Sequence, residues 1–338
     1  MHNGTPKKRS DRAKRAALLI AVNLGIFVLL LLLLEIILHF ARIPYSEDFI
    51  PSENALAHFD EELGWDYIPG LSKDVVFGSR VVPVHFDENG IRVPEQGHRL
   101  SPDRPSVLFI GGSYTMGHGL TYDESFVGQF DELTGHAYQA VNLGVQAYGT
   151  DQALIALKKF APLFNTKVVV YTFIEDHIYR NGTYDRRYQY PNARIIGTKP
   201  LFALDRDNKL YIEKQPRLYK DLPHSHVYDL LKLKLTTLLG IPPPYPEELT
   251  KALIQEMADY CKTRHIQFIL LNWRWTDEDY DNFGDMTVQK IDTLENAPAG
   301  WADMRIPQDG HPNAEASRHA ALLLFNTLQK MSLLKKNS

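Results

Sequence analysis

The sequence is almost without cysteine. Of its 338 residues only Cys261 carries a thiol, which excludes a disulfide within the chain and leaves the redox compartment undetermined. The sequence also has no excess of basic residues, because 37 lysines and arginines stand against 41 aspartates and glutamates and give a formal net charge of −4. A chain with this charge balance is not expected to bind nucleic acid as its main partner.

Two common kinds of ligand-binding motif are also missing. The glycine-rich stretch 111–119 lacks the Gly-x-Gly-x-x-Gly spacing of a dinucleotide site, and no acidic residue is placed to bind a ribose. Five residues are of types that ligate metals, namely Glu175, Asp176, His177, Asp309 and His311. No His-x-His or Glu-x-x-His spacing groups them. We therefore expect neither a cofactor nor a bound metal.

A long uncharged run follows a basic amino terminus. Residues 1–15 hold six lysines and arginines against one aspartate, and the 19 residues 16–34 hold no charge. That length crosses a bilayer core as a helix, so we predict a transmembrane helix over 16–39. The basic flank predicts that 1–15 form a cytoplasmic tail and that the rest of the chain faces outward. A cleaved signal peptide is the alternative, although 38–42 offer no convincing cleavage site.

The stretch 40–104 joins this helix to the rest of the chain. It contains short apolar runs at 75–77 and 81–84, and a turn sequence, Asp-Glu-Asn-Gly, at 87–90. We expect a juxtamembrane segment with short strands that packs against the domain that follows, rather than a disordered tether.

From residue 105 onward, strand patterns alternate with helical patterns. Strands are predicted at 107–110, 140–142, 167–174 and 267–271. Thr121 and Glu124 have the spacing of a capping box that opens a helix. The alternation predicts an α/β fold with three layers, α/β/α, around a mainly parallel sheet. Residues 182–245 interrupt it, and we predict that they form an insertion within a domain of residues 105–331.

A serine follows the first predicted strand of this domain. The strand runs into Gly111 and Gly112, which we expect to supply positive φ angles for a tight turn before Ser113. Open α/β folds keep their sites at the carboxyl edge of the sheet, where this serine would lie. A tight turn with an incidental serine is the alternative.

A histidine with a nearby carboxylate lies far downstream of that serine. Asp309 and His311 immediately precede the amphipathic run 314–328. Serine, histidine and aspartate together activate a hydroxyl, because the histidine takes its proton while the acid orients the imidazole and stabilises the imidazolium. Sequence separation does not show that the three meet, and a plain helix-entry turn is the alternative.

Taken together, these stretches resemble the SGNH (GDSL-type) hydrolase superfamily. The resemblance covers about residues 105 to 331 and is carried by Gly-Gly-Ser-x-Thr-x-Gly at 111–117, Asn-Leu-Gly at 142–144 and Asp-x-His-Pro-Asn at 309–313. It implies a flavodoxin-like sandwich and an esterase that forms an acyl-enzyme.

The resemblance assigns three catalytic roles. Ser113 would be the nucleophile, His311 the base and Asp309 the group that orients it. Two details depart from the family pattern. Gly112 stands where the family has aspartate, and the aspartate and histidine are two residues apart rather than three.

The resemblance also implies an oxyanion hole with three donors. Two would be the N–H groups of Ser113 and Ala147, the latter standing in place of a family glycine. The third is an asparagine in the family and corresponds to Glu175 here, which can donate only when protonated. Either its pKa is raised, or His177 or Asn181 takes the role, or this donor is missing.

Two tryptophans follow the fourth predicted strand of the domain. Indole faces offer flat apolar area for sugar rings, so Trp273 and Trp275, together with His177, are candidates for binding substrate. The alternation of side chains along an extended segment predicts that one of the two indoles is buried.

These observations lead to one expectation with two alternatives. We expect a single-pass membrane protein with an extracytoplasmic serine esterase domain, whose partners are the bilayer and an ester, such as an O-acyl group of a cell-envelope glycan. Acyl transfer to a sugar hydroxyl would use the same acyl-enzyme. A catalytically silent binding or assembly protein would keep the same fold.

Overall fold

The computed structural model describes residues 7–41, 43, 56–186, 197–221, 225–242 and 244–334. The chain divides into two compact units. One comprises Met1–Asp48 and Leu222–Pro242, and the other comprises Phe49–Asp221 and Pro243–Ser338. The 21 residues Leu222–Pro242, which lie inside the predicted insertion, thus group with the amino-terminal helix.

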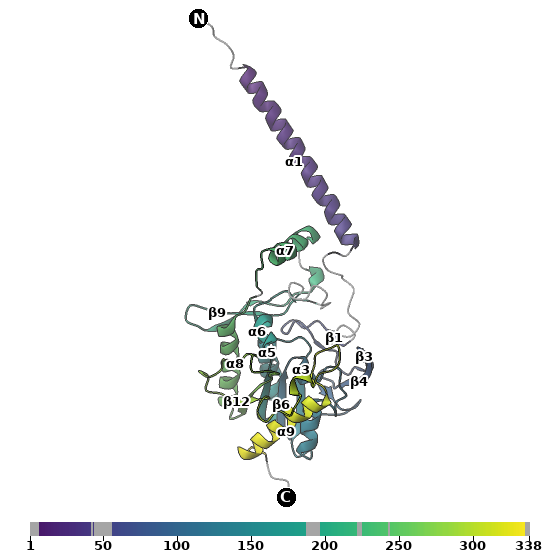
Figure 1. Ribbon diagram of the computed structural model, residues 1–338, viewed down its shortest axis with the longest axis vertical. Coiled ribbons are helices and arrows are strands. Elements are labelled where there is room, and N and C mark those ends of the chain that lie inside the picture. The colour runs from purple at the N-terminus through teal and green to yellow at the C-terminus, as the bar shows by residue number, and fades with distance from the viewer. Residues whose placement is uncertain are drawn as a thin grey trace. The chain divides into compact units, whose positions relative to one another are not determined.

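The smaller unit contains a long apolar helix, α1 (Lys7–Ala41), which Figure 1 shows in purple. The part from Arg12 to Ala41 is long and apolar enough to cross a membrane, with a mean hydropathy of 3.0 in its most apolar window, and none of that window is buried in the protein. A signal sequence passes the same test of length and composition. The same unit contains a second helix, α7 (His226–Leu238).

An eight-stranded sheet forms the centre of the larger unit, in the order β12-β11-β8-β6-β7-β5-β4-β3. The five strands from β12 to β7 are parallel, and β5, β4 and β3 continue the sheet antiparallel. Their bounds are β3 (Ser72–Phe77), β4 (Arg80–Phe86), β5 (Arg92–Val93), β6 (Pro105–Gly111), β7 (Gln139–Gly144), β8 (Asn165–Phe173), β11 (Gln267–Asn272) and β12 (Gln289–Asp292). The predicted mainly parallel α/β fold is confirmed.

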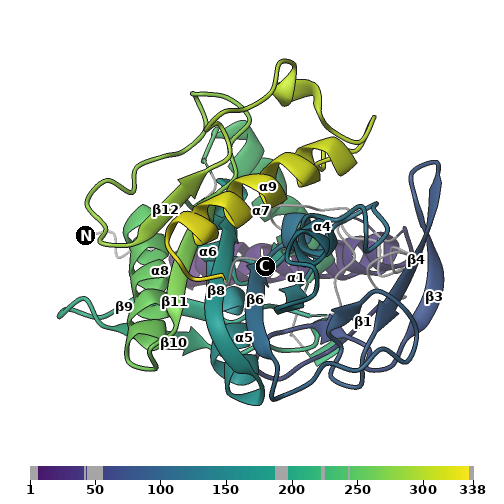
Figure 2. The same ribbon diagram turned by 90° about the horizontal axis from the view of Figure 1, so that it is seen from below.

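Helices cover both faces of the sheet, as Figure 2 shows. Alternate residues of β6 enter different cores: Leu108 and Ile110 enter one, Val107 and Phe109 the other. The first core also contains side chains of α5 (Thr150–Phe160) and α8 (Glu247–Lys262), and the second contains those of α4 (Phe126–Leu133) and α9 (Ala314–Lys330). The sheet therefore lies between two helical layers, which leaves its carboxyl edge open for a site.

The remaining elements are short. Two hairpin-like pairs lie outside the main sheet, β1 (Ala57–His58) with β2 (Asp66–Tyr67) and β9 (Leu201–Leu204) with β10 (Leu210–Lys214). The short helices are α3 (Ser113–Met116), α6 (Asp176–Asn181), η1 (Ala161–Leu163), η3 (Tyr219–Asp221) and η4 (Trp301–Asp303).

Residues that precede position 105 are part of the main sheet. β5 pairs with β7 through Arg92 and Asn142, and β4 and β3 extend the sheet beyond it. On β4, Val82 and Val84 are fully buried whereas Val81 is exposed, which is the alternation of a strand with one face on the core. The stretch 56–104 therefore extends the sheet that carries the candidate site.

The start of α4 differs from the prediction. Thr121 and Glu124 do interact, because the Glu124 carboxylate accepts the Thr121 N–H at 3.0 Å. The helix nevertheless begins at Phe126, and its N-cap is Ser125, whose hydroxyl accepts the Gly128 N–H at 3.2 Å. Serine is itself a preferred N-cap residue, so the later cap determines where the helix starts.

Candidate active site

Ser113 lies at the carboxyl end of the central strand. It is the first residue of α3, directly after β6, and β6 lies between the parallel strands β7 and β8. Its side chain is 6% exposed. The parallel strands thus present Ser113 at the edge of the sheet where α/β folds keep their sites.

The two glycines before Ser113 have different roles. Gly111 has φ +149°, and a Cβ on it would lie 2.5 Å from Thr115 Oγ1. Gly112 has φ −92°, so the predicted positive φ is correct for Gly111 and wrong for Gly112. A Cβ on Gly112 would lie 3.0 Å from His177 Nε2 and 3.2 Å from Arg180 Nη1. The His177 and Arg180 side chains thus fill the space beside Gly112, the residue before Ser113.

Ser113, His311 and Asp309 meet in one chain of hydrogen bonds. His311 Nε2 lies 2.8 Å from Ser113 Oγ, and His311 Nδ1 lies 2.5 Å from Asp309 Oδ1. An ionised carboxylate can only accept, so Nδ1 carries the ring proton and Nε2 is free to accept the serine proton. This is the geometry of a nucleophile, its base and an orienting acid.

Burial and charge set the protonation of this cluster. Burial lowers the pKa of His311 below its ordinary 6.5, and the hydrogen bond to Asp309 opposes that shift only in part. Hydrogen bonds from His118 and His311 hold the pKa of Asp309 well below its usual range. At neutral pH His311 is therefore a neutral base beside an ionised carboxylate.

A further histidine, to which the sequence analysis assigns no role, completes the cluster. His118 Nε2 lies 3.3 Å from Asp309 Oδ2, and its ring stacks on that of His311 with centroids 4.1 Å apart. His118 Nδ1 lies 2.5 Å from Gln146 Nε2. Because that amide nitrogen donates, Nδ1 accepts, and Nε2 carries the proton that is donated to Asp309. His118 thus binds the carboxylate oxygen that His311 leaves free.

The ligand atoms of His118, Asp309 and His311 all lie within 4.8 Å of one another, a set that could also hold a metal ion. The same nitrogen and oxygen atoms are joined by the hydrogen bonds just described, which a metal would have to replace. The expectation of no metal stays a prediction.

Replacing His118 with phenylalanine should move the pH dependence of turnover. Phenylalanine keeps a stacked ring but loses the donor to Asp309, and it removes a neighbour that lowers the pKa of His311. Both changes raise the pKa of His311, so the acid limb of the kcat/KM profile should shift to higher pH, with kcat lowered by about tenfold. His118→Gln, whose amide can still donate to Asp309 but which also lacks the imidazole, should shift the acid limb less than His118→Phe does. An unshifted acid limb in His118→Phe would show that His118 does not position Asp309.

Ala147 lies in the loop 145–148 that joins β7 to α5, and its backbone is left-handed with φ +71°. Residues of β2 and its neighbourhood hold this loop. Trp65 Nε1 donates to Gln146 O at 3.0 Å, the Gln146 N–H donates to the Tyr67 hydroxyl at 3.0 Å, and the Tyr148 hydroxyl donates to Trp65 O at 2.7 Å. Several contacts thus keep a conformation that is unfavourable for alanine.

Ala147→Gly should stabilise the protein. Glycine adopts positive φ without the Cβ clash, so relief of strain should raise the free energy of unfolding by about 0.5–1 kcal/mol, after the entropy that glycine adds to the unfolded chain. Urea unfolding measures the change. Ala153→Gly, inside α5, is the control in a helical backbone and should lower stability by at least about 1 kcal/mol, because Ala153 is also fully buried. A loss of stability in Ala147→Gly would contradict the strained conformation.

Glu175, the residue in the position of the third oxyanion donor, has partners away from the serine. Its Oε1 accepts the Tyr245 hydroxyl at 3.2 Å, and its Oε2 accepts the Tyr280 N–H at 3.3 Å. Both carboxylate oxygens therefore act as acceptors. A donor role for Glu175 stays a prediction, and these contacts do not support it.

The two alternatives to Glu175 are buried. His177 is 1% exposed, its Nδ1 lies 2.8 Å from the Tyr171 hydroxyl, and burial holds its pKa well below the usual range. Asn181 accepts the Thr150 N–H at 2.8 Å and so caps the start of α5. His177 thus lies beside Gly112 and Asn181 at the start of α5, and substrate contact by His177 stays a prediction.

Trp273 and Trp275 are both buried, so the prediction that only one is buried is wrong. Residues two apart in an extended segment lie on the same side, so alternation does not separate these two indoles. They are 3% and 8% exposed and pack beside Trp301, with ring centroids 6.0 and 5.0 Å away. Trp275 Nε1 donates to the Tyr114 hydroxyl at 3.2 Å, and the Arg305 guanidinium lies 4.4 Å from the Trp275 ring centroid. Neither indole has a free face here, so their substrate contact stays a prediction.

Arg92 supports the site from the edge of the sheet, and sequence analysis missed it. This side chain is 1% exposed and donates to the carbonyls of Met116, Gly117 and Leu120. Burial lowers its pKa to about 10. The arginine thus holds the turn that follows α3 and carries His118.

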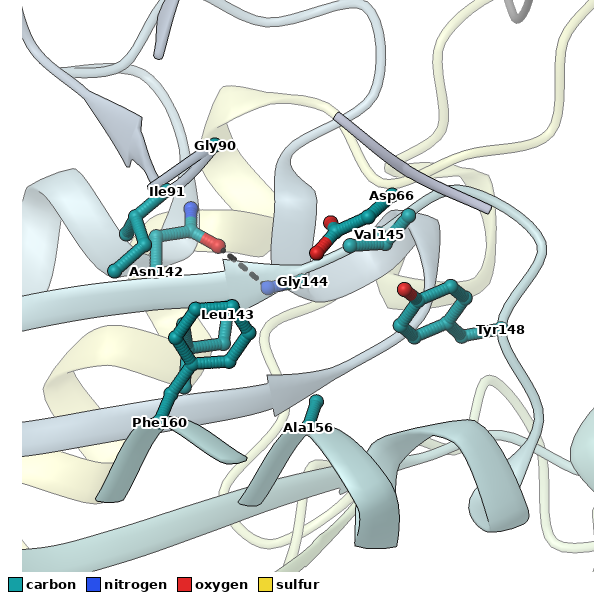
Figure 3. A pocket seen from close by; sticks show the side chains of 10 residues that line it. All are labelled: Asp66, Gly90, Ile91, Asn142, Leu143, Gly144, Val145, Tyr148, Ala156 and Phe160. Atoms are coloured by element: carbon teal, nitrogen blue, oxygen red, sulfur yellow. Dashed lines mark hydrogen bonds between the residues drawn. The ribbon is translucent and has the colours of Figure 1, made fainter. Parts of the chain in front are cut away.

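A small cavity lies beside the end of β7, as Figure 3 shows, and Asn142, Gly144 and Tyr148 are among the residues that line it. The Asp66 carboxylate lies in it beside the Tyr148 ring, and Asn142 Oδ1 accepts the Gly144 N–H at 3.0 Å on the other side. Asp66 accepts a hydrogen bond from the Tyr67 N–H at 2.8 Å. Burial raises the pKa of Asp66 to about 7.

Asp66 should make the fold less stable as the pH rises. Its pKa is about 7 in the folded chain against an ordinary value of 3.8, so between these pH values the folded state binds more protons and stability falls with rising pH. Asp66→Asn should remove this slope and be more stable at pH 8 by on the order of 3–4 kcal/mol. Urea unfolding at pH 4 and pH 8 tests this. Asp74→Asn, at an exposed position on β3, should keep the slope, and a slope that survives in Asp66→Asn would contradict the assignment.

Comparison with known proteins adds only distant similarities. No model of a known protein family matches the sequence, and no curated protein sequence matches it. Among solved structures, a psychrotrophic esterase EstA from Pseudoalteromonas sp. is 11% identical with a TM-score of 0.38, over 68% of this chain and 99% of that one. A GDSL-like lipase from Bacteroides thetaiotaomicron VPI-5482 is 13% identical with a TM-score of 0.37, over 68% and 89%.

A member of the lipolytic protein G-D-S-L family from Veillonella parvula DSM 2008 is similar at the same level, with 11% identity and a TM-score of 0.35, over 67% of this chain and 99% of that one. Similarities with TM-scores this low do not establish a shared activity. The functional assignment therefore depends on the geometry of the site.

Proposed function

We propose that the protein is a membrane-anchored serine esterase of the SGNH type. One observation carries the proposal, namely the continuous chain of hydrogen bonds from Ser113 through His311 to Asp309 at the carboxyl edge of a parallel sheet. Its support is geometric: the imidazole is in the tautomer that accepts a proton from the serine, and its pKa is lowered so that it is neutral at neutral pH.

The first half of the reaction forms an acyl-enzyme. As Ser113 Oγ bonds to the acyl carbon of the ester, its proton passes to His311 Nε2, and Asp309 stabilises the imidazolium. The tetrahedral intermediate then collapses, the ester C–O bond breaks, and the imidazolium gives its proton to the departing alkoxide. Water enters for the second half, and His311 takes a proton from it as the water oxygen bonds to the acyl carbon. The bond between that carbon and Ser113 Oγ then breaks, the imidazolium returns its proton to Ser113 Oγ, and the carboxylic acid leaves.

Two backbone donors would stabilise the oxyanion. Among the described residues, the N–H groups of Ser113 and Ala147 have no hydrogen-bond acceptor, so both are available. Glu175 stands in the position of the family's third donor, but both of its carboxylate oxygens accept hydrogen bonds. Because one such donor contributes about 10²–10³ in rate, we expect a slower enzyme than one with three donors.

The anchor, the topology and the substrate class extend the proposal. α1 would span the bilayer once, with the basic residues before it in the cytoplasm and the esterase domain outside. An esterase held at that surface meets acylated envelope glycans, so the proposed substrate is an O-acyl ester of such a glycan. Acyl transfer remains the second enzymatic candidate because the same acyl-enzyme can react with a sugar hydroxyl instead of water.

The test uses the full chain in detergent micelles. It is incubated with p-nitrophenyl esters of increasing acyl length and with O-acetylated polysaccharide, and release of alcohol and acid is followed. Hydrolysis without an acceptor supports the esterase. Turnover only when a glycan acceptor is added would show a transferase instead of an esterase. No turnover of either substrate, with or without the acceptor, would contradict enzymatic function and favour a binding protein.

A further inference from the structure

One side of α7 is apolar and exposed. Four of its large apolar side chains are 51–80% exposed, namely Tyr228, Leu231, Leu235 and Leu238. At 3.6 residues per turn they fall on one side of the helix, and Lys232 and Lys234 fall on its two borders. Both lysines are also exposed. His226 and Asp229, on the opposite side, are buried. A soluble helix would normally turn its apolar side inward and leave the polar side in water.

The amino end of α7 is bound by a carboxylate of α1. Glu35 Oε1 accepts the His226 N–H at 2.6 Å, and Glu35 Oε2 accepts the Val227 N–H at 2.9 Å and the Ser225 hydroxyl at 2.8 Å. These N–H groups have no partner within the helix, and a negative charge at that end is favoured by the helix dipole. His226 Nδ1 also lies 2.8 Å from the Ile43 carbonyl oxygen. Both connections fix α7 to the carboxyl end of α1.

α7 contacts the side of α1 on which Glu35 lies. Glu35 and Leu31 are partly covered and Leu38 is 6% exposed, whereas most of the helix around them is exposed. Residues spaced three and four apart share one side of a helix, so these three define the line on which α7 packs.

The position of Glu35 along α1 sets the depth of α7. The 19 uncharged residues 16–34 come directly before it. At about 1.5 Å per residue they span roughly 30 Å, which is the thickness of the hydrocarbon core. In a spanning α1, Glu35 therefore lies where the hydrocarbon ends and the headgroups begin, and α7 starts at that level.

We propose that α7 is an interfacial helix that binds the outer leaflet of the bilayer. Its apolar side inserts among the lipid acyl chains, and Lys232 and Lys234 extend from the borders to the lipid phosphates. The occupant of the apolar side is phospholipid, because the side begins at the membrane boundary set by Glu35 and is flanked by cations. This inference rests on the membrane anchor in the proposed function, not on the esterase activity.

A membrane-bound α7 would also change how the larger unit is tethered. Its chain leaves at Asp221 and returns at Pro243, with α7 between. The larger unit would thus be linked to the membrane by two segments of chain, one that follows α1 and one through α7, rather than by a single linker.

Site-specific fluorescence in a bilayer tests the proposal. Full-length Cys261→Ala protein is reconstituted into vesicles of phosphatidylethanolamine and phosphatidylglycerol, and nitrobenzoxadiazole is attached to one new cysteine at a time. The positions are Leu235→Cys on α7, Leu24→Cys on α1 and Tyr211→Cys on β10, which is an exposed aromatic control in the larger unit. Emission wavelength reports water exposure, and quenching by lipids that carry a nitroxide reports contact with lipid.

The proposal predicts blue-shifted emission that is quenched by lipid nitroxides at positions 24 and 235, and water-like emission at position 211. A nitroxide near the headgroup should quench the probe at 235 more strongly than the probe at 24. Glu35→Ala should reduce quenching at 235 and leave it unchanged at 24. Quenching at 24 with water-like emission at 235 would overturn the interfacial helix while the anchor stands. A blue shift at 235 without quenching would mean that protein covers this side, and no quenching at 24 would overturn the anchor and this inference together.

Discussion

Ser113→Ala should lower kcat for an ester substrate by about 10⁴–10⁶-fold, because it removes the atom that attacks the acyl carbon. His311→Ala should have a loss of the same size, since His311 Nε2 is the only group placed 2.8 Å from Ser113 Oγ among the described side-chain contacts. The double variant should be no slower than either single variant, because the two residues act as one unit. Asp309→Asn should cost about 10⁴-fold by favouring the wrong tautomer of His311.

The controls separate chemistry from folding. Ser106→Ala removes another buried serine hydroxyl, at the start of the same strand β6, and should leave kcat within about twofold of wild type. Circular dichroism should be unchanged in the active-site variants. Activity within tenfold of wild type in Ser113→Ala would contradict the nucleophile, and additive losses in the double variant would contradict the shared proton transfer.

Lys199→Met should lower the free energy of unfolding by about 3–5 kcal/mol, because it leaves Asp151 as a buried unpaired charge. Both side chains are 0% exposed, and the Lys199 ammonium bonds to Asp151 and donates to the Pro200 carbonyl at 2.8 Å. Asp151 lies in the first turn of α5, just after the loop that holds Ala147. Breaking this pair should therefore also loosen the proposed oxyanion loop.

A double-variant cycle distinguishes the pair from its parts. Lys199→Met with Asp151→Leu removes both charges and should recover most of the stability lost in the single variant, as measured by urea unfolding. Lys158→Met is the matched control, because Lys158 pairs with Glu256 across the surface at 2.5 Å with both side chains 42% exposed, and it should cost less than about 1 kcal/mol. A double variant as unstable as Lys199→Met would mean that packing, not the charge pair, determines the loss.

The central elements were predictable because they are determined by local patterns. β6 and β8 are buried on both faces, so their apolar runs are continuous and stand out in the sequence. α8 and α9 each place apolar side chains in one core at helical spacing. Ser113, His311 and Asp309 could be named because their residue types have a known joint chemistry, even though the sequence could not show that they meet.

Other features depend on contacts between distant segments and leave no local trace. His118 is a loop histidine among glycines, and its role depends on the approach of the Asp309 turn. Arg92 resembles a surface residue in the sequence but is buried against three carbonyl groups. Lys199 lies within the predicted insertion, and its partner Asp151 belongs to a different element. The local sequence therefore did not reveal that Lys199 is buried in an ion pair.

The pairing of β3 to β5 with the main sheet was likewise beyond local inference. Their sequences indicate short strands, but a strand pattern does not specify its partner, and β5 joins β7 through a single pair, Arg92 with Asn142. The same applies to α7, whose amphipathic pattern predicts a helix but not the direction of its apolar side. The direction is set by the hydrogen bonds of Glu35 to the start of α7, which exist only in the folded chain.

The most direct test of the central claim is mass spectrometry of the protein after reaction with a fluorophosphonate. Such a reagent bonds covalently to a serine oxygen only when a base removes the serine proton. The site described here predicts one adduct per chain, on the peptide that contains Ser113, formed by the wild type and by Ser106→Ala but not by Ser113→Ala or His311→Ala. An adduct on another residue, or an adduct on Ser113 that forms equally fast in His311→Ala, would contradict a Ser113 hydroxyl activated by His311.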